Sequence, residues 1–253
     1  RLQPVELLKP FFIIMLALII SNKKFFNYTT KFFISFLLTS SIILLLVLQP
    51  DLGQTLLIGL SWAILIFVSG INLLVLISIS VIGIISLLFI VFYLPKFEYI
   101  KNRLLSFFDT QTGTHNFQSD KALDSITSGG FFGKGIGEGT LKNRVPEAHT
   151  DYIISVISEE FGVIAIILIL ILFLVFIFSI LKKVDSETNN TIKLILVGSA
   201  SLILLQAMIH IGVNIRLFPT TGMTLPFLSY GGSSIISVSI LSGIILNLTK
   251  RKV

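Results

Sequence analysis

The 253-residue sequence contains no cysteine and few charged residues. The absence of cysteine excludes a disulfide framework, cysteine-ligated zinc and thiol chemistry. Only 13% of the residues are charged, whereas 54% are hydrophobic. A soluble domain of this length needs far more polar surface than this composition provides. The composition therefore predicts a membrane protein.

Long apolar segments are present instead, and they predict an all-α, polytopic membrane helix bundle. A helix that crosses a bilayer needs roughly 20 apolar residues. The hydrophobic pattern predicts seven spans within a single membrane domain that covers residues 1–253, at 6–20, 32–48, 55–70, 73–94, 152–181, 193–215 and 232–249. The sequence opens at Arg1, at the edge of a helix and without a signal peptide. We therefore expect upstream helices that are absent from this chain.

Basic residues gather in three segments that alternating spans place on one side of the membrane. These residues are Lys23, Lys24 and Lys31, then Lys182, Lys183 and Lys193, and finally Lys250, Arg251 and Lys252. By the positive-inside rule this side is the cytoplasm. The formal net charge of +6 is then a consequence of topology, and a nucleic-acid partner is not expected. The other face receives the turn 49–53, the loop 216–231 and the long segment 95–151.

The segment 95–151 is longer than a simple connector requires and leads into an aspartate at the start of the fifth span. Asp151 could simply cap that helix. A polar or small stripe, however, recurs from it at roughly helical spacing: Asp151, Ser155, Ser158, Glu159 and Gly162. An acid as deep as Glu159 is rare unless it faces a protein interior or a watery cavity. The stripe predicts a polar cavity open to the outer face, with Asp151 at its rim.

A second polar stripe lies on the sixth span, where Gln206, His210 and Asn214 are spaced four residues apart. A lone histidine on an apolar helix is more often a satisfied core residue than a ligand. The three together predict a hydrogen-bond track that faces the bundle. A metal site is not supported, because His210 has no second histidine at ligand spacing.

Further candidates lie at the predicted membrane borders. Glu6 and Lys9 share one helix face, either as a snorkelling ion pair or as part of the cavity that contains Asp151. Asp51 is expected to cap the third span. The loop 216–231 is either a plain re-entrant turn or an anion site, since a helix N-terminus beside Arg216 could hold a diphosphate. Ser233 lies at that helix start, and Lys142 and Arg144 are further candidate cations on the outer face. No nucleotide-binding motif is present.

Five motifs resemble the SEDS family in order and spacing, across essentially the whole chain. They are Gln3 to Lys9, Gln49 to Gly53, the glycine-rich run Phe117 to Thr140, Pro146 to Gly162, and Pro219 to Ser234. The resemblance implies a ten-helix fold of which this chain is the last seven helices. It also implies a multi-pass protein of the bacterial inner membrane that polymerises lipid II into glycan strands on the periplasmic face.

Two details resemble the division branch of the family more than its elongation branch. These are Ala148, where the elongation branch usually has arginine, and the run Thr221 to Pro226. Val5 departs from the family, which usually has serine there. The alternatives are an elongation-type polymerase, a scaffold protein, or a lipid II flippase that would use the intramembrane charges as a polar path.

The resemblance implies that Asp151 is the essential catalytic acid. The expected substrate-binding residues are Glu6, Lys9, Lys142, Arg144, His149, Glu159, His210, Arg216 and Ser233. No cofactor is expected, and the sequence gives no support for a divalent cation. The expected partners are lipid II, a class B penicillin-binding transpeptidase and other division proteins.

Overall fold

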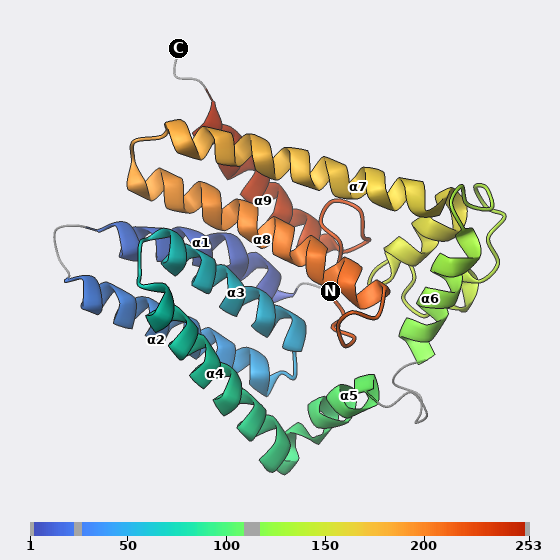
Figure 1. Ribbon diagram of the computed structural model, residues 1–253, viewed down its shortest axis with the longest axis horizontal. Coiled ribbons are helices and arrows are strands. Elements are labelled where there is room, and N and C mark those ends of the chain that lie inside the picture. The colour runs from blue at the N-terminus through green and yellow to red at the C-terminus, as the bar shows by residue number, and fades with distance from the viewer. Residues whose placement is uncertain (1–2, 23–26, 109–116, 251–253) are drawn as a thin grey trace. The chain divides into compact units, whose positions relative to one another are not determined.

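The computed structural model describes residues 3–22, 27–108 and 117–250, and within them all regular structure is helical. Figure 1 shows the elements: α1 Pro4–Ser21, α2 Tyr28–Leu48, α3 Leu52–Val68, α4 Leu73–Tyr93, α5 Glu98–Phe108, α6 Phe117–Gly129, α7 Ile153–Ser186, α8 Asn190–Asn214 and α9 Gly232–Thr249. Two short 3-10 turns, Pro95–Phe97 and Lys142–Arg144, complete the set. The predicted all-α fold is confirmed.

The seven predicted spans correspond to α1, α2, α3, α4, α7, α8 and α9, with ends that differ by a few residues. Among the described residues, all of these but α3 are long and apolar enough to cross a membrane. α3 has 17 residues, at the short end of the roughly 17–25 that a span uses. Four of the basic residues used for orientation, Lys23, Lys24, Arg251 and Lys252, lie outside the described residues.

The helix starts follow from local chemistry. Pro4 occupies the first turn of α1, where its missing N–H has no helical partner to lose. The carboxylate of Asp51 accepts a hydrogen bond from the Gln54 amide at 3.0 Å, so the predicted cap of α3 is confirmed. The side chain of Asn72 caps α4 in the same way, through the Leu74 amide at 2.9 Å.

Residue contacts divide the chain into two compact units. The first comprises Arg1–Glu98, Ile177–Leu205 and Gly232–Val253, and the second comprises Tyr99–Phe176 and Gln206–Gly231. α7 and α8 each contribute to both units. The single membrane domain expected over residues 1–253 stays a prediction.

In the first unit, α1 packs against α2, α3 and α9. Its side chains Ile13 and Leu16 are fully buried. A side chain at Gly198 of α8 would lie 2.7 Å from the Ile13 side chain, so glycine permits this close packing. α4, in contrast, leaves large side chains such as Leu74 and Ile82 exposed, as expected of a surface that faces lipid.

In the second unit, α7 is interrupted at Gly162, where φ is 78° and ψ is −179°. The span predicted at 152–181 is present, but it contains a break that the sequence did not predict. Four backbone hydrogen bonds to the glycine-rich segment take the place of the helical ones: Lys134 N to Glu159 O at 2.8 Å, Gly135 N to Glu160 O at 3.0 Å, Val163 N to Gly130 O at 3.0 Å and Ile164 N to Phe131 O at 3.4 Å. In an unbroken helix, the amides of residues 163 and 164 would bind the carbonyls of residues 159 and 160. We call this contact the glycine splice.

The glycine splice requires two backbones to touch. A Cβ atom at Gly162 would lie 2.1 Å from the Phe131 carbonyl oxygen, and one at Gly133 would lie 2.2 Å from the Glu160 carbonyl oxygen. Both glycines also have a positive φ of 78°, which side-chain-bearing residues rarely adopt. The splice attaches the segment expected to lie on the outer face directly to the helix that follows Asp151.

Candidate active site

Asp151 lies in a turn that precedes α7. Its amide donates to the Glu147 carbonyl at 3.0 Å, and the Thr150 amide donates to the same oxygen at 3.1 Å. α7 begins at Ile153, which puts Tyr152, rather than Asp151, at the capping position. The side chain of Asp151 is half-buried. The position of this acid is therefore set by a built turn that leaves part of it accessible.

Three hydrogen bonds fix the backbone around Asp151, and they come from α8 and from the loop before α9. Tyr230 N donates to His149 O at 2.9 Å, Ser229 Oγ donates to Thr150 O at 2.6 Å, and Asn214 Nδ2 donates to Asp151 O at 3.1 Å. Ser229 and Tyr230 were not among the candidate site residues predicted from the sequence. The one sequence feature that could have pointed to these two residues is that they form a polar pair in a loop rich in proline and glycine.

The loop 216–231 also leaves room beside the Asp151 carboxylate. A Cβ atom added at Gly222 would lie 3.4 Å from Asp151 Oδ2. The neighbouring Tyr152 is buried. Burial raises the pKa of the Tyr152 phenol, and the Asp151 carboxylate raises it further, so the phenol stays neutral and competes for no proton near neutral pH.

The polar stripe of α8 binds the same loop. Gln206 Nε2 donates to the Thr224 carbonyl at 3.0 Å. His210 Nδ1 lies 2.6 Å from the Met223 carbonyl oxygen, so Nδ1 carries the proton, because a carbonyl can only accept. The predicted hydrogen-bond track is confirmed. It holds the loop 216–231 against the helix.

Three buried polar atoms in this unit have no partner among the described residues: His210 Nε2, Asn214 Oδ1 and Thr221 Oγ1. Buried polar atoms are satisfied in the great majority of cases, and exceptions mark bound water or function. His210 Nε2 and Asn214 Oδ1 are hydrogen-bond acceptors, so each can accept a hydrogen bond from a hydroxyl group or a water molecule. The substrate contact predicted for His210 and the exposed His149 stays a prediction.

Glu159 is fully buried and bound by protein groups on both carboxylate oxygens. The donors are Leu141 N at 3.0 Å, Lys142 N at 2.6 Å, Ser125 Oγ at 3.1 Å and Lys134 Nζ at 3.4 Å. The sequence allowed either a protein interior or a watery cavity around Glu159, and the structure shows a protein interior. Glu159 thereby anchors residues 134–142, and its substrate contact stays a prediction.

Two of the three candidate cations are already paired. The guanidinium of Arg216 bonds to Asp120, and the ammonium of Lys142 bonds to Glu160. Arg144 is exposed and forms no ion pair within the described part of the chain. Of these three cations, Arg144 is therefore the one whose charge is available to an anionic ligand. Residues 3–22, 27–108 and 117–250 hold no cluster of three metal-binding side chains.

In the first unit, Glu6 and Lys9 form a buried ion pair. Lys9 Nζ lies 2.7 Å from Glu6 Oε1, and Gln54 Nε2 donates to that oxygen at 2.7 Å. Lys9 is 0% exposed and Glu6 is 2% exposed, which contradicts the snorkelling interpretation. Glu6 Oε2 and Gln54 Oε1 remain buried and unpartnered among the described residues. Such a pair seldom improves stability, so a functional role is favoured.

Ser233 also belongs to the first unit. Its hydroxyl accepts a hydrogen bond from the Gln3 amide at 2.9 Å, which ties the start of α1 to the start of α9. Its predicted contact with substrate stays a prediction, and so does the cavity that the sequence predicts Glu6 and Lys9 to share with Asp151.

Comparison with known proteins gives consistent matches. A family model described as "cell cycle protein", for FtsW, RodA and SpoVE, matches residues 1–253. The probable peptidoglycan glycosyltransferase FtsW of Caulobacter vibrioides is 33% identical over 99% of this chain and 63% of its own length. The protein of the same name from Bacillus subtilis is 32% identical over 81% of this chain and 53% of its own length. The chain thus spans only part of the relatives that it matches.

Two solved structures are similar over 98% of this chain. One is a peptidoglycan synthase complex described as coordinating polymerization and crosslinking, with a TM-score of 0.74, 26% identity and 69% of that chain covered. The other is the rod shape determining protein RodA of Thermus thermophilus, with a TM-score of 0.64, 27% identity and 64% of that chain covered.

Proposed function

Because the chain belongs to the FtsW, RodA and SpoVE family of cell cycle proteins, we propose that it is part of a peptidoglycan glycosyltransferase that polymerises lipid II during cell division. The division branch is favoured over the elongation branch because the curated relatives are FtsW proteins. The chain spans 63% of the length of the Caulobacter relative, so the activity is proposed for the protein of which this chain is a part.

One observation supports this function best: the half-buried carboxylate of Asp151 on a backbone held by three hydrogen bonds. A general base must be held at a fixed distance from the proton that it takes. Rigid support of this kind favours such a role over that of an accidental surface acid.

The proposed reaction joins two lipid-linked saccharides. The 4-hydroxyl of the acceptor's N-acetylglucosamine attacks the anomeric carbon of the donor while Asp151 takes the hydroxyl proton. The bond from that carbon to the diphosphate oxygen breaks, and the lipid diphosphate leaves from the opposite face with inversion. Arg144 is the proposed counter-charge for the diphosphate, because among the described residues it is the candidate cation that forms no ion pair. Such charge stabilisation lowers the barrier to departure of an anion.

The proposed location is the bacterial inner membrane, with Asp151 on the periplasmic side. The basic residues on the α1–α2 and α7–α8 connections support this orientation. A class B penicillin-binding transpeptidase is the proposed partner, together with other division proteins. The similarity to the chain of a complex that coordinates polymerization and crosslinking supports such a partner.

A lipid II flippase remains a second candidate, because one carboxylate oxygen of the buried Glu6 and Lys9 pair has no hydrogen-bond partner among the described residues. Reconstituted protein that carries this chain, together with the transpeptidase, should be given labelled lipid II and the products separated by length. Glycan polymer is the expected result. Movement of lipid II between leaflets without polymer would support the flippase. The absence of both polymer and movement would support a scaffold.

A further inference from the structure

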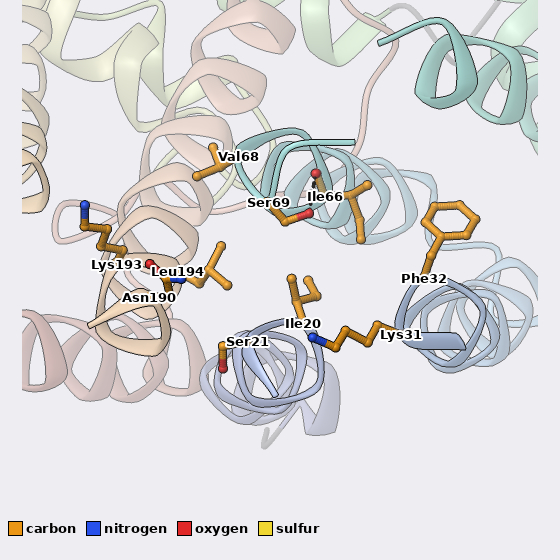
Figure 2. Close-up of a pocket in the computed structure, with 10 residues that line it drawn as sticks. All are labelled: Ile20, Ser21, Lys31, Phe32, Ile66, Val68, Ser69, Asn190, Lys193 and Leu194. Carbon is orange, nitrogen blue, oxygen red and sulfur yellow. Dashed lines mark hydrogen bonds between the residues drawn. The ribbon is translucent and has the colours of Figure 1, made fainter. Parts of the chain in front are cut away.

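A pocket of about 260 Å³ in the first unit is not used by the proposed reaction. It lies where α1 and α3 end and α2 and α8 begin. Its polar lining residues are Ser21, Lys31, Ser69, Asn190 and Lys193. We call it the lysine pocket. Figure 2 shows Lys31 reaching across the pocket beside Ile20, and Lys193 at the opposite rim with its ammonium turned outward.

Within the described residues, no acidic side chain pairs with the two lysines of the lysine pocket. None of its lining residues is acidic. Across residues 3–22, 27–108 and 117–250, neither Lys31 nor Lys193 forms an ion pair or donates a side-chain hydrogen bond. The carbonyl ends of α1 and α3 lie at the same pocket, yet neither ammonium binds them. The carboxamide of Asn190 likewise has no hydrogen-bond partner in that part of the chain.

The two lysines are also badly placed for the helices that carry them. Lys31 and Lys193 stand in the first turns of α2 and α8. A helix N-terminus carries a partial positive charge, so a cation in this turn is disfavoured. An anion bound between the two lysines would offset the unfavourable interaction of each ammonium with its helix N-terminus. Lysines that only face solvent would gain nothing from this placement.

The surroundings select a lipid over a free ion. The pocket wall includes Phe32 and Leu194, and the neighbouring Phe33 and Phe67 are 61% and 54% exposed. Apolar surface next to a cationic pocket matches a headgroup that continues into acyl chains. By the charge distribution, this end of the bundle faces the cytoplasmic leaflet, which is rich in anionic lipid.

We propose that the lysine pocket binds the phosphate group of an anionic phospholipid of the cytoplasmic leaflet. Lys31 and Lys193 supply the charge, and Asn190 supplies a neutral hydrogen-bond donor. This site does not depend on the glycosyltransferase proposal.

The test measures lipid retained by the purified protein in native mass spectrometry, with phosphatidylglycerol against zwitterionic phosphatidylcholine as probes. The variant Lys31→Gln with Lys193→Gln is compared with Lys182→Gln plus Lys183→Gln, which removes equal charge near the same membrane face but outside the pocket. We expect the pocket variant to lose roughly tenfold or more of its phosphatidylglycerol affinity, because each lysine near an anionic surface contributes about a factor of five. In the control variant, the logarithm of the fold loss in phosphatidylglycerol affinity should be less than half of that in the pocket variant.

Three results would overturn the proposal. These are an equal loss in both double variants, equal retention of the two lipids by the unaltered protein, and displacement of the lipid by millimolar inorganic phosphate, which would indicate a free-ion site. The variant Lys31→Arg with Lys193→Arg should keep the selectivity. If the double glutamine variant is not recovered, Lys193→Gln alone at the rim serves for the comparison, with Lys182→Gln as its control.

Discussion

At the scale of single residues, contacts from a loop and from α8 hold the backbone of the turn that carries Asp151. Ser229 and Asn214 bind the carbonyls of residues 150 and 151. Ser229 Oγ also accepts from the Leu225 amide at 2.8 Å, so one hydroxyl joins the turn of Asp151 to the loop 216–231. Small changes in that loop are therefore expected to act on the position of the carboxylate.

Gly222→Ala tests this connection. At this position φ is +64°, and the new Cβ would lie 3.4 Å from Asp151 Oδ2. We expect a loss of stability of about 1–2 kcal/mol from the left-handed backbone, and a fall in polymerisation rate larger than the loss of folded protein explains. The measurements are thermal unfolding in detergent and the initial rate with labelled lipid II.

Gly70→Ala is the matched control for Gly222→Ala. It has φ of +91° and nothing within 4 Å of the added atom. It carries the same kind of backbone strain, but the added atom would contact no carboxylate. Equal rates for the two variants, after correction for folded protein, would contradict a role for the space beside Asp151.

At the scale of elements, the glycine splice is the feature that the sequence predicted least well. Hydrophobic length predicted the seven long apolar helices, six of which are long enough to cross a membrane, because bilayer thickness sets the length of a span. The break at Gly162 was missed because a glycine inside a helical pattern is usually tolerated. Four hydrogen bonds to a segment about 30 residues away cause the break, and local propensity does not contain them. The Arg216–Asp120 pair was missed for the same reason, whereas Asp51 was predicted correctly because helix capping is local.

Gly162→Ala should disrupt the splice. The added atom would lie 2.1 Å from the Phe131 carbonyl oxygen, and both partners are backbone that cannot rotate away. We expect a destabilisation of at least about 3 kcal/mol, in the range of severe single substitutions. Thermal unfolding and limited proteolysis of residues 129–145 measure it.

The control for this change is Gly243→Ala in α9, where nothing lies within 4 Å of the added atom. Alanine favours a helix over glycine by about 1 kcal/mol, so this variant should be as stable as the parent or slightly more stable. An unfolding temperature for Gly162→Ala that equals that of Gly243→Ala would mean that the splice does not exist.

At the scale of the whole molecule, the charge distribution predicts which side of the membrane each connection faces. The exposed Lys182 and the half-buried Lys183 lie near the C-terminal end of α7, whereas the half-buried Asp151 precedes its N-terminal end. Because the two ends of a spanning helix lie on opposite faces, orientation decides whether Asp151 can meet lipid-linked sugars outside the cell.

The chain has no cysteine, so one introduced thiol per variant reports the side on which it lies. In intact cells, a membrane-impermeant maleimide should label Glu138→Cys in the outer segment. It should label Thr188→Cys, in the connection between α7 and α8, only after the inner membrane is opened. Both positions are exposed, so burial does not explain a difference. The reverse pattern would contradict the orientation, and with it the periplasmic site.

The base role of Asp151 is tested most directly by polymerisation with Asp151→Asn. This change keeps the size of the side chain and removes its ability to take a proton. Glu138→Gln, an exposed acid of the same outer segment, is the matched control. With both variants inserted in the membrane to the parent level, we expect no glycan from Asp151→Asn, a fall of at least about a hundredfold, as is typical for loss of a general base, and unchanged synthesis by Glu138→Gln. Glycan synthesis by Asp151→Asn at the rate of the parent would contradict the proposed mechanism.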